Sequence, residues 1–261
     1  MSVVLLDDAI VHYEVLGRGR PVVFLHGWVG SWRYWISSMQ VTSTSFRAYA
    51  LDLWGFGDTA HKKDRYGLKT QTKLVRSFLD EMGIGKIALI GHGLGALVAL
   101  DFASSHKEIV DRVMLTNCSL DMSKVNPKLF EDSPEKLADW LSNDLPAVKS
   151  ALTDAEKADT DAILASRNET EILQLFDGVN RQHTPCLFVN GALDELVEPL
   201  ILDNSMLSML GHSITLEESG HFPMLDSAST FNRLLTDFLA LDSGLSIQDL
   251  GLKEEWKRRV R

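Results

Sequence analysis

The segment 89–97, LIGHGLGAL, has the order of elements on which nucleophilic catalysis depends. An apolar strand runs into a tight glycine turn and then into a helix of small residues, as in a nucleophile elbow, G-x-S-x-G. Gly91 and Gly95 hold the outer positions, and Gly93 stands where the attacking side chain is expected. Residues 79–102 contain no Ser, Thr or Cys that a shifted alignment could supply. The pattern therefore predicts an elbow without its nucleophile.

An acid and a base follow the elbow in the order that a catalytic triad requires. GALDELV (191–197) supplies Asp194, and ESGHFPMLD (218–226) supplies His221, each after a predicted strand. A single Asp or His at the end of a strand is usually a turn or surface residue. The order elbow, acid, histidine is more specific, and it predicts that His221 acts as a general base oriented by Asp194.

Two glycine-containing turns precede the elbow. HGWVGSW (26–32) follows an apolar run, and its backbone can present N–H groups to a developing oxyanion, although it also fits a plain strand-to-loop turn. DLWGFGDT (52–59) contains Asp52. We expect Asp52 to accept hydrogen bonds from the N–H groups of this loop rather than to take part in catalysis. Open α/β sheets place ligand sites at the carboxyl ends of their strands, so the motifs are expected to meet there.

Apolar runs alternate with helical patterns along most of the chain. Such runs are typical of strands in a parallel sheet covered on both faces, and their alternation with helices predicts right-handed βαβ units. The fold class is therefore α/β, with an antiparallel hairpin in the first 16 residues at the sheet edge. The expected strands are 22–27, 48–55, 86–93, 112–117, 186–194 and 213–221, and the expected helices are 68–84, 94–110, 196–210 and 229–240.

The stretch 119–183 interrupts this alternation with a helical, acidic segment. SPEKLADWLSN within it begins at a favourable N-cap and Pro pair, and no strand is apparent. We expect a helical cap over 119–183, inserted between the sixth and seventh strands of a core domain formed by 1–118 and 184–243. The alternative is a set of surface helices with no role as a lid.

These ordered motifs resemble the α/β-hydrolase superfamily, in the branch of small capped esterases, haloalkane dehalogenases, epoxide hydrolases and related lyases. The resemblance extends from about residue 8 to residue 240. It implies the α/β-hydrolase fold, a mostly parallel eight-stranded sheet flanked by helices, with a helical cap insertion. It also implies that Asp194 is the triad acid and His221 the base, and that the N–H groups of Trp28 and Leu94 form the oxyanion hole.

The chain departs from this family at Gly93, where members carry Ser, or Asp in the dehalogenase and epoxide-hydrolase branches. The preceding residue, His92, is one that the family often has, with its side chain directed away from the reaction centre. An elbow residue adopts positive φ, which strains a residue with a side chain by roughly 1–3 kcal/mol, and glycine removes that strain. Gly93 is compatible with a natural loss of the nucleophile or with an engineered Ser-to-Gly change.

Cys118, which follows a neighbouring strand, is the first candidate for a replacement nucleophile. A reactive thiolate needs a lowered pKa, and no basic residue adjoins Cys118, so a small apolar core residue is the favoured interpretation. Cys118 and Cys186 are the two cysteines of the chain. Two cysteines cannot form a disulfide framework, and both are expected as reduced thiols.

The expected ligand is small and largely apolar, with one carbonyl or oxyanion-like group. Trp28, Trp32 and Phe222 are the predicted substrate-contacting residues, although each fits core packing equally well. The absent side chain at Gly93 is expected to leave extra room, and a serine restored there is expected to gain esterase activity. No metal-ligand spacing, phosphate loop or dinucleotide motif is present, so neither a metal nor a cofactor is predicted.

Three functions are consistent with these residues. The first is a carboxylester-hydrolase scaffold that binds its ligand with little or no turnover, as a pseudoenzyme. The second is an enzyme that uses the His221–Asp194 dyad as a general base without a nucleophile, in water-directed hydrolysis, a lyase reaction or a cofactor-free oxygenation. The third is an active serine hydrolase that carries an engineered Ser-to-Gly change.

The net charge of −10 argues against nucleic acid as a partner, since binding to phosphates needs a positive face. The N-terminus, MSVVLLDDAI, has neither the basic region of a signal peptide nor the apolar length of a membrane span. A cytoplasmic protein without membrane association is therefore expected. The tail 244–261 carries five basic residues and Trp256. It either docks on a protein partner or on the acidic cap of this chain, or forms a solvated helix.

Overall fold

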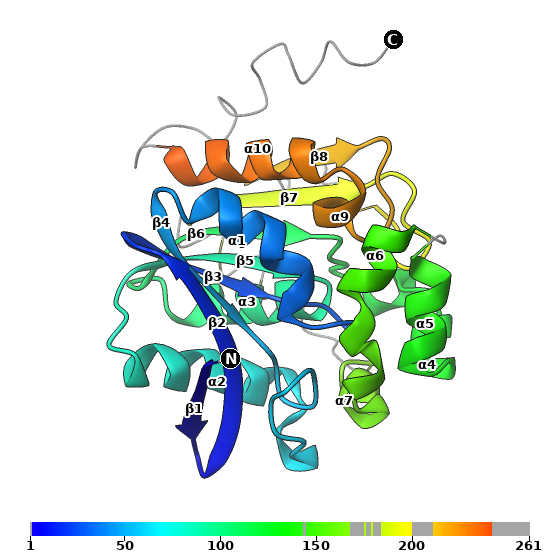
Figure 1. Cartoon of the computed structure of the whole chain (residues 1–261), viewed down its shortest axis with the longest axis horizontal. Helices are drawn as coiled ribbons and strands as arrows, with labels where there is room; N and C mark the ends of the chain where they lie inside the picture. The colour runs from blue at the N-terminus through cyan, green and yellow to red at the C-terminus, as the bar shows by residue number, and fades with distance from the viewer. Residues whose placement is uncertain are drawn as a thin grey trace.

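A mixed eight-stranded sheet forms the centre of the protein, with the strand order β1-β2-β4-β3-β5-β6-β7-β8 (Figure 1). The computed structural model describes residues 2–142, 145–167, 175, 179, 184–199 and 211–241. The strands are β1 (Ser2–Leu6), β2 (Ala9–Gly17), β3 (Arg20–Leu25), β4 (Phe46–Leu51), β5 (Ile87–His92), β6 (Val110–Thr116), β7 (Cys186–Gly191) and β8 (Gly211–Leu216). Strands β3 to β8 are parallel, and β2 pairs antiparallel with β1 and β4. The predicted mostly parallel sheet with an edge hairpin is confirmed.

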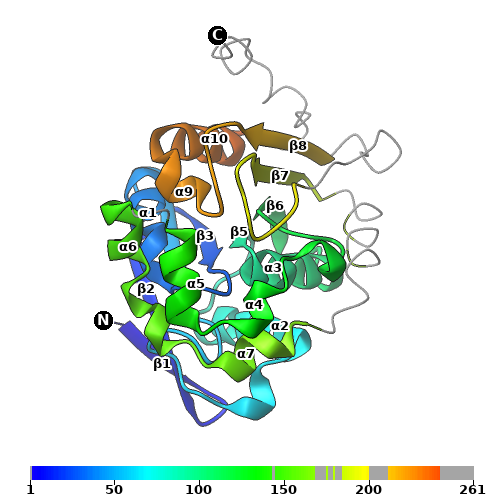
Figure 2. The same cartoon turned by 90° about the vertical axis from the view of Figure 1, so that its right-hand side faces the viewer.

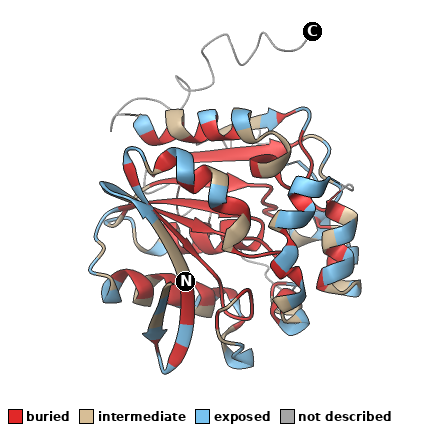
Figure 3. Ribbon diagram, viewed as in Figure 1, coloured by how far each residue is buried: buried red, intermediate tan, exposed pale blue. Residues whose placement is uncertain are grey.

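Helices cover both faces of this sheet (Figure 2). The helices α2 and α3 pack against each other on one face, and α1 packs with α10 on the other. Buried residues concentrate on the sheet and on the helix surfaces that face it, as the red ribbon in Figure 3 shows. The bounds are α1 (Ile36–Thr42), α2 (Leu68–Glu81), α3 (Leu94–Ser105), α9 (Pro223–Asp226) and α10 (Ala228–Ala240).

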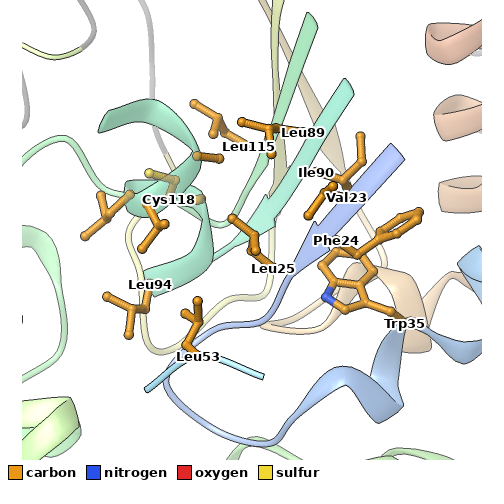
Figure 4. Packing of buried hydrophobic residues seen from close by; sticks show 14 of the residues in the cluster. Val23, Phe24, Leu25, Trp35, Leu53, Leu89, Ile90, Leu94, Leu115 and Cys118 are labelled. Carbon is orange, nitrogen blue, oxygen red and sulfur yellow. The ribbon is translucent and has the colours of Figure 1, made fainter. Parts of the chain in front are cut away.

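The central strands are buried on both faces, as their continuous apolar runs predict. Figure 4 shows Val23, Phe24 and Leu25 of β3 beside Leu89 and Ile90 of β5 in the core. All five side chains are fully buried. Because successive side chains of a strand point to opposite faces, this burial requires helices on both sides of the sheet. The two central strands are therefore packed on both faces, and they carry the site loops at their carboxyl ends.

Among the described residues, four α-helices between β6 and β7 lie together beyond the carboxyl ends of the parallel strands (Figure 1). They are α4 (Lys128–Glu131), α5 (Pro134–Leu141), α6 (Pro146–Ala151) and α7 (Thr160–Ala165). The start of α5 matches its sequence signal, since Pro134 is its first residue and the Ser133 hydroxyl accepts the N–H of Lys136. The later part of the expected cap, apart from two positions between 168 and 183, lies outside the described residues.

The helix predicted for 196–210 is wrong at its start. Val197 instead forms an antiparallel bridge with Val125. The carboxylate of Asp194 accepts the N–H groups of Leu196 and Val197, and these hydrogen bonds hold the backbone in a turn. The part of this predicted helix from residue 200 onward lies outside the described residues.

Cys118 and Cys186 are both buried and free. Within the described residues, no helix is long and apolar enough to cross a membrane. The basic tail 244–261 lies outside the described residues.

Candidate active site

Gly93 forms the turn between β5 and α3, as the elbow pattern predicts. Its φ is +50° and its ψ is −114°, a conformation that strains any residue with a side chain. Its N–H donates to the carbonyl of Thr116 at 3.0 Å, which ties the turn to the end of β6. The next residue, Leu94, begins α3. The turn has the geometry of a nucleophile elbow but no side chain to carry out the attack.

The indole of Trp28 covers the position where a side chain at residue 93 would start. A Cβ built on Gly93 would lie 2.8 Å from Cε3 and 2.9 Å from Cζ3 of Trp28, closer than real Cβ atoms approach. Trp28 is fully buried, and its Nε1–H donates to the hydroxyl of Ser166 at 2.9 Å. The extra room expected at Gly93 is therefore absent. That prediction was wrong because a neighbouring side chain fills the space.

His221 and Asp194 make the predicted contact. Nδ1 of His221 lies 3.0 Å from Oδ2 and 3.1 Å from Oδ1 of Asp194, and both side chains are 1% exposed. Because Nδ1 donates to a carboxylate, Nε2 carries the lone pair of the neutral ring. Nε2 is buried and has no hydrogen-bond partner in the described part of the chain. The arrangement can take a proton from a ligand or from a water molecule.

Asn117 fixes the loop that carries His221. Its Nδ2 donates to the carbonyls of Gly220 and His221, both at 3.0 Å, and its Oδ1 accepts the N–H of Gly191 at 2.8 Å. Its φ of +43° lies in the left-handed region, which asparagine adopts more readily than most residues. Sequence reasoning missed this role, because the bonded groups lie 74 to 104 positions away along the chain.

His92 contacts the dyad directly. Its ring centroid lies 4.6 Å from that of His221, and its Nε2 donates to the His221 carbonyl at 2.7 Å. Its Nδ1 accepts from the Tyr34 hydroxyl at 3.0 Å, and that hydroxyl accepts the N–H of Gly27. Burial, helped by His221, holds the pKa of His92 well below its usual value, so the ring is neutral. The expectation that His92 points away from the centre was wrong, since it connects His221 to the Gly27 turn.

The backbone N–H groups of Trp28 and Leu94 donate no hydrogen bond to any described residue. Leu94 is the first residue of α3, and the first N–H groups of a helix lack intrahelical partners and favour negative charge. The hydrogen bond from Gly27 to Tyr34 holds the turn just before Trp28. Both N–H groups are available for the predicted role as oxyanion donors.

A pocket of about 10 Å³ lies beside His221, which is space for one water molecule. It is lined by Trp140, Leu141, Leu193, Glu195 and His221. Trp140 of α5 donates from Nε1 to the Glu195 carboxylate at 2.8 Å, and this bond joins α5 to the loop after β7. None of the three aromatic residues predicted to contact substrate lines this pocket. This pocket therefore admits a water molecule but no larger ligand.

Phe222 and Trp32 are placed differently. The ring of Phe222 is fully buried and edge-on to His221, with the two centroids 4.9 Å apart. The ring of Trp32 lies 5.9 Å from that of His12, and the guanidinium of Arg33 lies over it at 5.4 Å. Phe222 therefore contacts the dyad, whereas Trp32 packs on side chains outside it.

Asp52 holds the N–H groups of its loop, which confirms the structural role predicted for it. Its Oδ1 accepts the N–H of Trp32 at 2.8 Å, and its Oδ2 accepts the N–H of Asp58 at 3.1 Å. The same Oδ2 lies 2.7 Å from Nδ1 of His12. Burial acts to lower the pKa of His12, but its hydrogen bonds to Asp52 and Glu14 raise that pKa above its usual value. These hydrogen bonds therefore favour the protonated form of His12 in the folded protein.

Polar contacts connect the helices beyond β6 to the loop that contains Trp28. Asp154 accepts from the hydroxyl of Ser31 at 2.9 Å and from Nε of Arg33 at 2.6 Å. Lys157 bridges Asp154 at 3.0 Å and Asp58 at 2.8 Å. The position of this loop therefore depends on the helices that cover it.

Cys118 has the properties of a core residue. It is 1% exposed, and burial raises the pKa of its thiol to about 12. Its Sγ contacts only the carbonyl of Ser119, at 3.8 Å, among the hydrogen bonds of the described residues. At neutral pH the sulfur is therefore a thiol, and nothing nearby activates it as a nucleophile.

A second cavity, of about 140 Å³, lies at the opposite edge of the sheet. Its lining consists of Arg20, Pro21, Phe46, Lys86, Ile87, Ala88, Asp111, Arg112 and Leu239. Arg112 donates to the carbonyl of Phe238 at 2.6 Å, and Arg20 reaches that of Leu239 at 3.5 Å. These arginines therefore satisfy carbonyl groups at the end of α10, which is a structural task.

A strand order of this kind, with a glycine elbow after β5 and an acid–histidine pair after β7 and β8, defines an α/β-hydrolase-type protein. The chain belongs to the alpha/beta hydrolase fold family, whose model matches residues 20–259.

Similar sequences and structures include esterases and epoxide hydrolases. A soluble epoxide hydrolase of Corynebacterium sp. (strain C12) is 33% identical over 105 residues, which are 40% of this chain and 37% of that protein. A pimeloyl-[acyl-carrier protein] methyl ester esterase of Vibrio cholerae is 22% identical over 253 residues, or 87% of this chain and 97% of the esterase. An esterase from Exiguobacterium antarcticum superposes with a TM-score of 0.78 at 19% identity, over 92% of this chain and 99% of that one. The chain thus spans little more than a third of the epoxide hydrolase but nearly all of the two esterases.

Proposed function

We propose that this protein binds a small, largely apolar carbonyl compound at the His221–Asp194 dyad and forms no acyl-enzyme intermediate. The observation that carries the proposal is the contact between Gly93 and Trp28, because a large buried side chain packs where a nucleophile would stand. A glycine fitted to its neighbour in this way favours a natural adaptation over an isolated Ser-to-Gly change. The names of the relatives, methyl ester esterase and epoxide hydrolase, support a small electrophilic compound as the ligand.

The binding groups in this proposal come from both parts of the molecule. The N–H groups of Trp28 and Leu94 receive the carbonyl oxygen, and Phe222 contributes apolar surface beside His221. The segment 119–183 acts as a cap, supported by its polar contacts with Ser31 and Arg33 and by the bond from Trp140 to Glu195.

A second candidate function is general-base catalysis by the dyad without a nucleophile. The specific observation in its favour is Nε2 of His221, which is buried, unpartnered within the described residues, and backed by the carboxylate of Asp194. Removing a triad nucleophile typically leaves roughly 10³–10⁴-fold acceleration over water, from the oxyanion hole and binding. A water directed by His221 is placed less accurately than a tethered hydroxyl, so turnover by this route is slow.

Rapid mixing of the native chain with a chromogenic aryl ester tests both candidates. We expect no burst of product, and a burst of one equivalent would contradict both. Steady turnover that disappears in His221→Ala supports the second candidate, and no turnover in either protein supports the first.

Binding is measured separately by titration calorimetry with a methyl ketone of the same acyl chain, which cannot be hydrolysed. The proposal requires this ketone to bind the native chain. A folded native chain that gives no heat with ketones of short and medium chain length would contradict it.

A further inference from the structure

We infer that the Trp28 indole is a built-in occupant of the ligand site, and that the ligand which displaces it is a planar aromatic compound with an N–H or O–H donor. This inference rests on the proposed function and narrows its ligand class. It also assigns Ser166 as the residue that selects the donor.

The space beside the elbow is taken by this one side chain. Trp28 is 0% exposed, and its Cε3 lies 2.8 Å from the position that a Cβ of residue 93 would take. The pocket next to His221 holds only about 10 Å³. A ligand that occupies the position of a side chain at residue 93 therefore replaces the indole, and the volume that it gains is flat and of indole size.

Ser166, the hydrogen-bond partner of the indole, determines which ligands can replace it. Ser166 donates its hydroxyl hydrogen to the carbonyl of Ile163 at 2.8 Å, so its oxygen presents only lone pairs toward Trp28. That oxygen accepts the Nε1–H of Trp28 at 2.9 Å, and Ser166 is 3% exposed. A displacing ligand without a donor would leave the Ser166 oxygen unpaired in a buried place, which is costly. A carbonyl compound that also carries an N–H or O–H donor on an aromatic ring meets this requirement, and one without a donor should bind more weakly.

The same bond couples the indole to the cap helices. Ser166 directly follows α7, and the loop that follows Trp28 is bound to this region through Ser31 and Asp154. Nothing charged holds the indole itself, because the bond to Ser166 is its one polar side-chain contact in the described part of the chain. Release of the ring therefore breaks one hydrogen bond between neutral groups.

The direct test uses the full native chain with ¹⁵N-labelled tryptophan, in which the Trp28 Nε1–H signal is assigned by its loss in Trp28→Phe. Indole is titrated as the probe, with indene as the matched compound that has the same shape and no N–H. We expect indole to shift or broaden the Trp28 signal, and indene to bind about three- to tenfold more weakly. Indole binding that leaves the Trp28 signal unmoved, equal binding of indene, or no binding of indole up to its solubility limit would overturn the inference.

A second test removes the occupant. Trp28→Ala leaves an indole-sized cavity, and we expect indole to raise its Tm and to bind more tightly than indene. In Trp28→Ala with Ser166→Ala the preference for indole should disappear. If Trp28→Ala does not fold, Trp28→Leu with and without Ser166→Ala gives the same comparison. A preference for indole that survives the loss of the Ser166 hydroxyl contradicts the role of that residue.

The indole experiments can fail without contradicting the proposed function. The ester burst and ketone titration use the native chain without indole. A missing burst together with no indole effect would leave the proposed function standing and reject only this ligand class.

Discussion

The ring of Trp28 lies 2.8 Å from the point where a Cβ of residue 93 would begin, and Gly93 holds a φ of +50° beneath it. The two residues form one packing unit. The glycine lets the indole approach the elbow backbone, and the indole in turn excludes any larger residue from the elbow. The missing nucleophile is therefore a property of the pair, and this changes what a restored serine should do.

Gly93→Ser alone is expected to give no esterase activity, contrary to the expectation from the sequence. The new Cβ overlaps the indole, and the backbone of a serine at this position has a strained φ. We therefore expect the free energy of unfolding to fall by on the order of 2–4 kcal/mol. Gly93→Ser with Trp28→Ala frees the space while keeping the backbone donors and the dyad. This double variant should show an acyl-enzyme burst with a chromogenic aryl ester. The matched control is Gly93→Ala with Trp28→Ala, and a burst from Gly93→Ser alone would show that the indole is no obstacle.

Asn117→Ala should destabilise the protein by about 2–3 kcal/mol, because it leaves the buried N–H of Gly191 and the carbonyl of Gly220 without their partner. Urea unfolding followed by circular dichroism measures the change. Asn126→Ala is a suitable control, since its side chain makes its contacts at the surface, and it should cost less than about 1 kcal/mol. Equal losses in the two variants would refute the positioning role of Asn117.

Cys118 should not react with a thiol reagent in the native protein at pH 8. Burial raises the pKa of its thiol to about 12 and removes it from solvent, and Cys186 is buried as well. Titration with Ellman's reagent should detect no thiol in the folded chain and both thiols in denaturant. Rapid labelling of one thiol before unfolding would reopen Cys118 as a nucleophile.

The contribution of His12 to stability should decrease as the pH rises. Its pKa in the folded protein lies above the unfolded value of 6.5, because its bonds to Asp52 and Glu14 outweigh the effect of burial. The folded state therefore binds the proton more tightly than the unfolded state. The stabilisation is fully present below pH 6.5 and is lost as the pH passes through the folded pKa.

Unfolding free energies of the native chain and of His12→Gln, measured from pH 5.5 to 9, test this sign. The difference between the two should shrink toward alkaline pH. A difference that grows with pH would mean that His12 is held neutral in the folded state.

The sequence by itself determined the sheet, the elbow and the acid–histidine pair. The apolar runs predict buried parallel strands, and parallel strands bring their carboxyl ends to one edge, so Gly93, Asp194 and His221 had to meet there. The glycine spacing around residue 93 likewise predicts a positive φ, which the structure confirms. These conclusions depend on local patterns and on chain order, both of which a single sequence carries.

Only the tertiary structure decided what fills the site. The indole of Trp28 bonds to Ser166, 138 positions away, and Asn117 bonds to a carbonyl 104 positions away. No local pattern marks such pairs, because their partners are chosen by packing after the chain has folded. The same limit applies to His92, whose contact with His221 depends on two loops meeting, and to the turn at Asp194 that replaces a predicted helix. The sequence therefore determined that an elbow, an acid and a histidine are present. Long-range packing determined that the Trp28 indole covers the position of a side chain at residue 93.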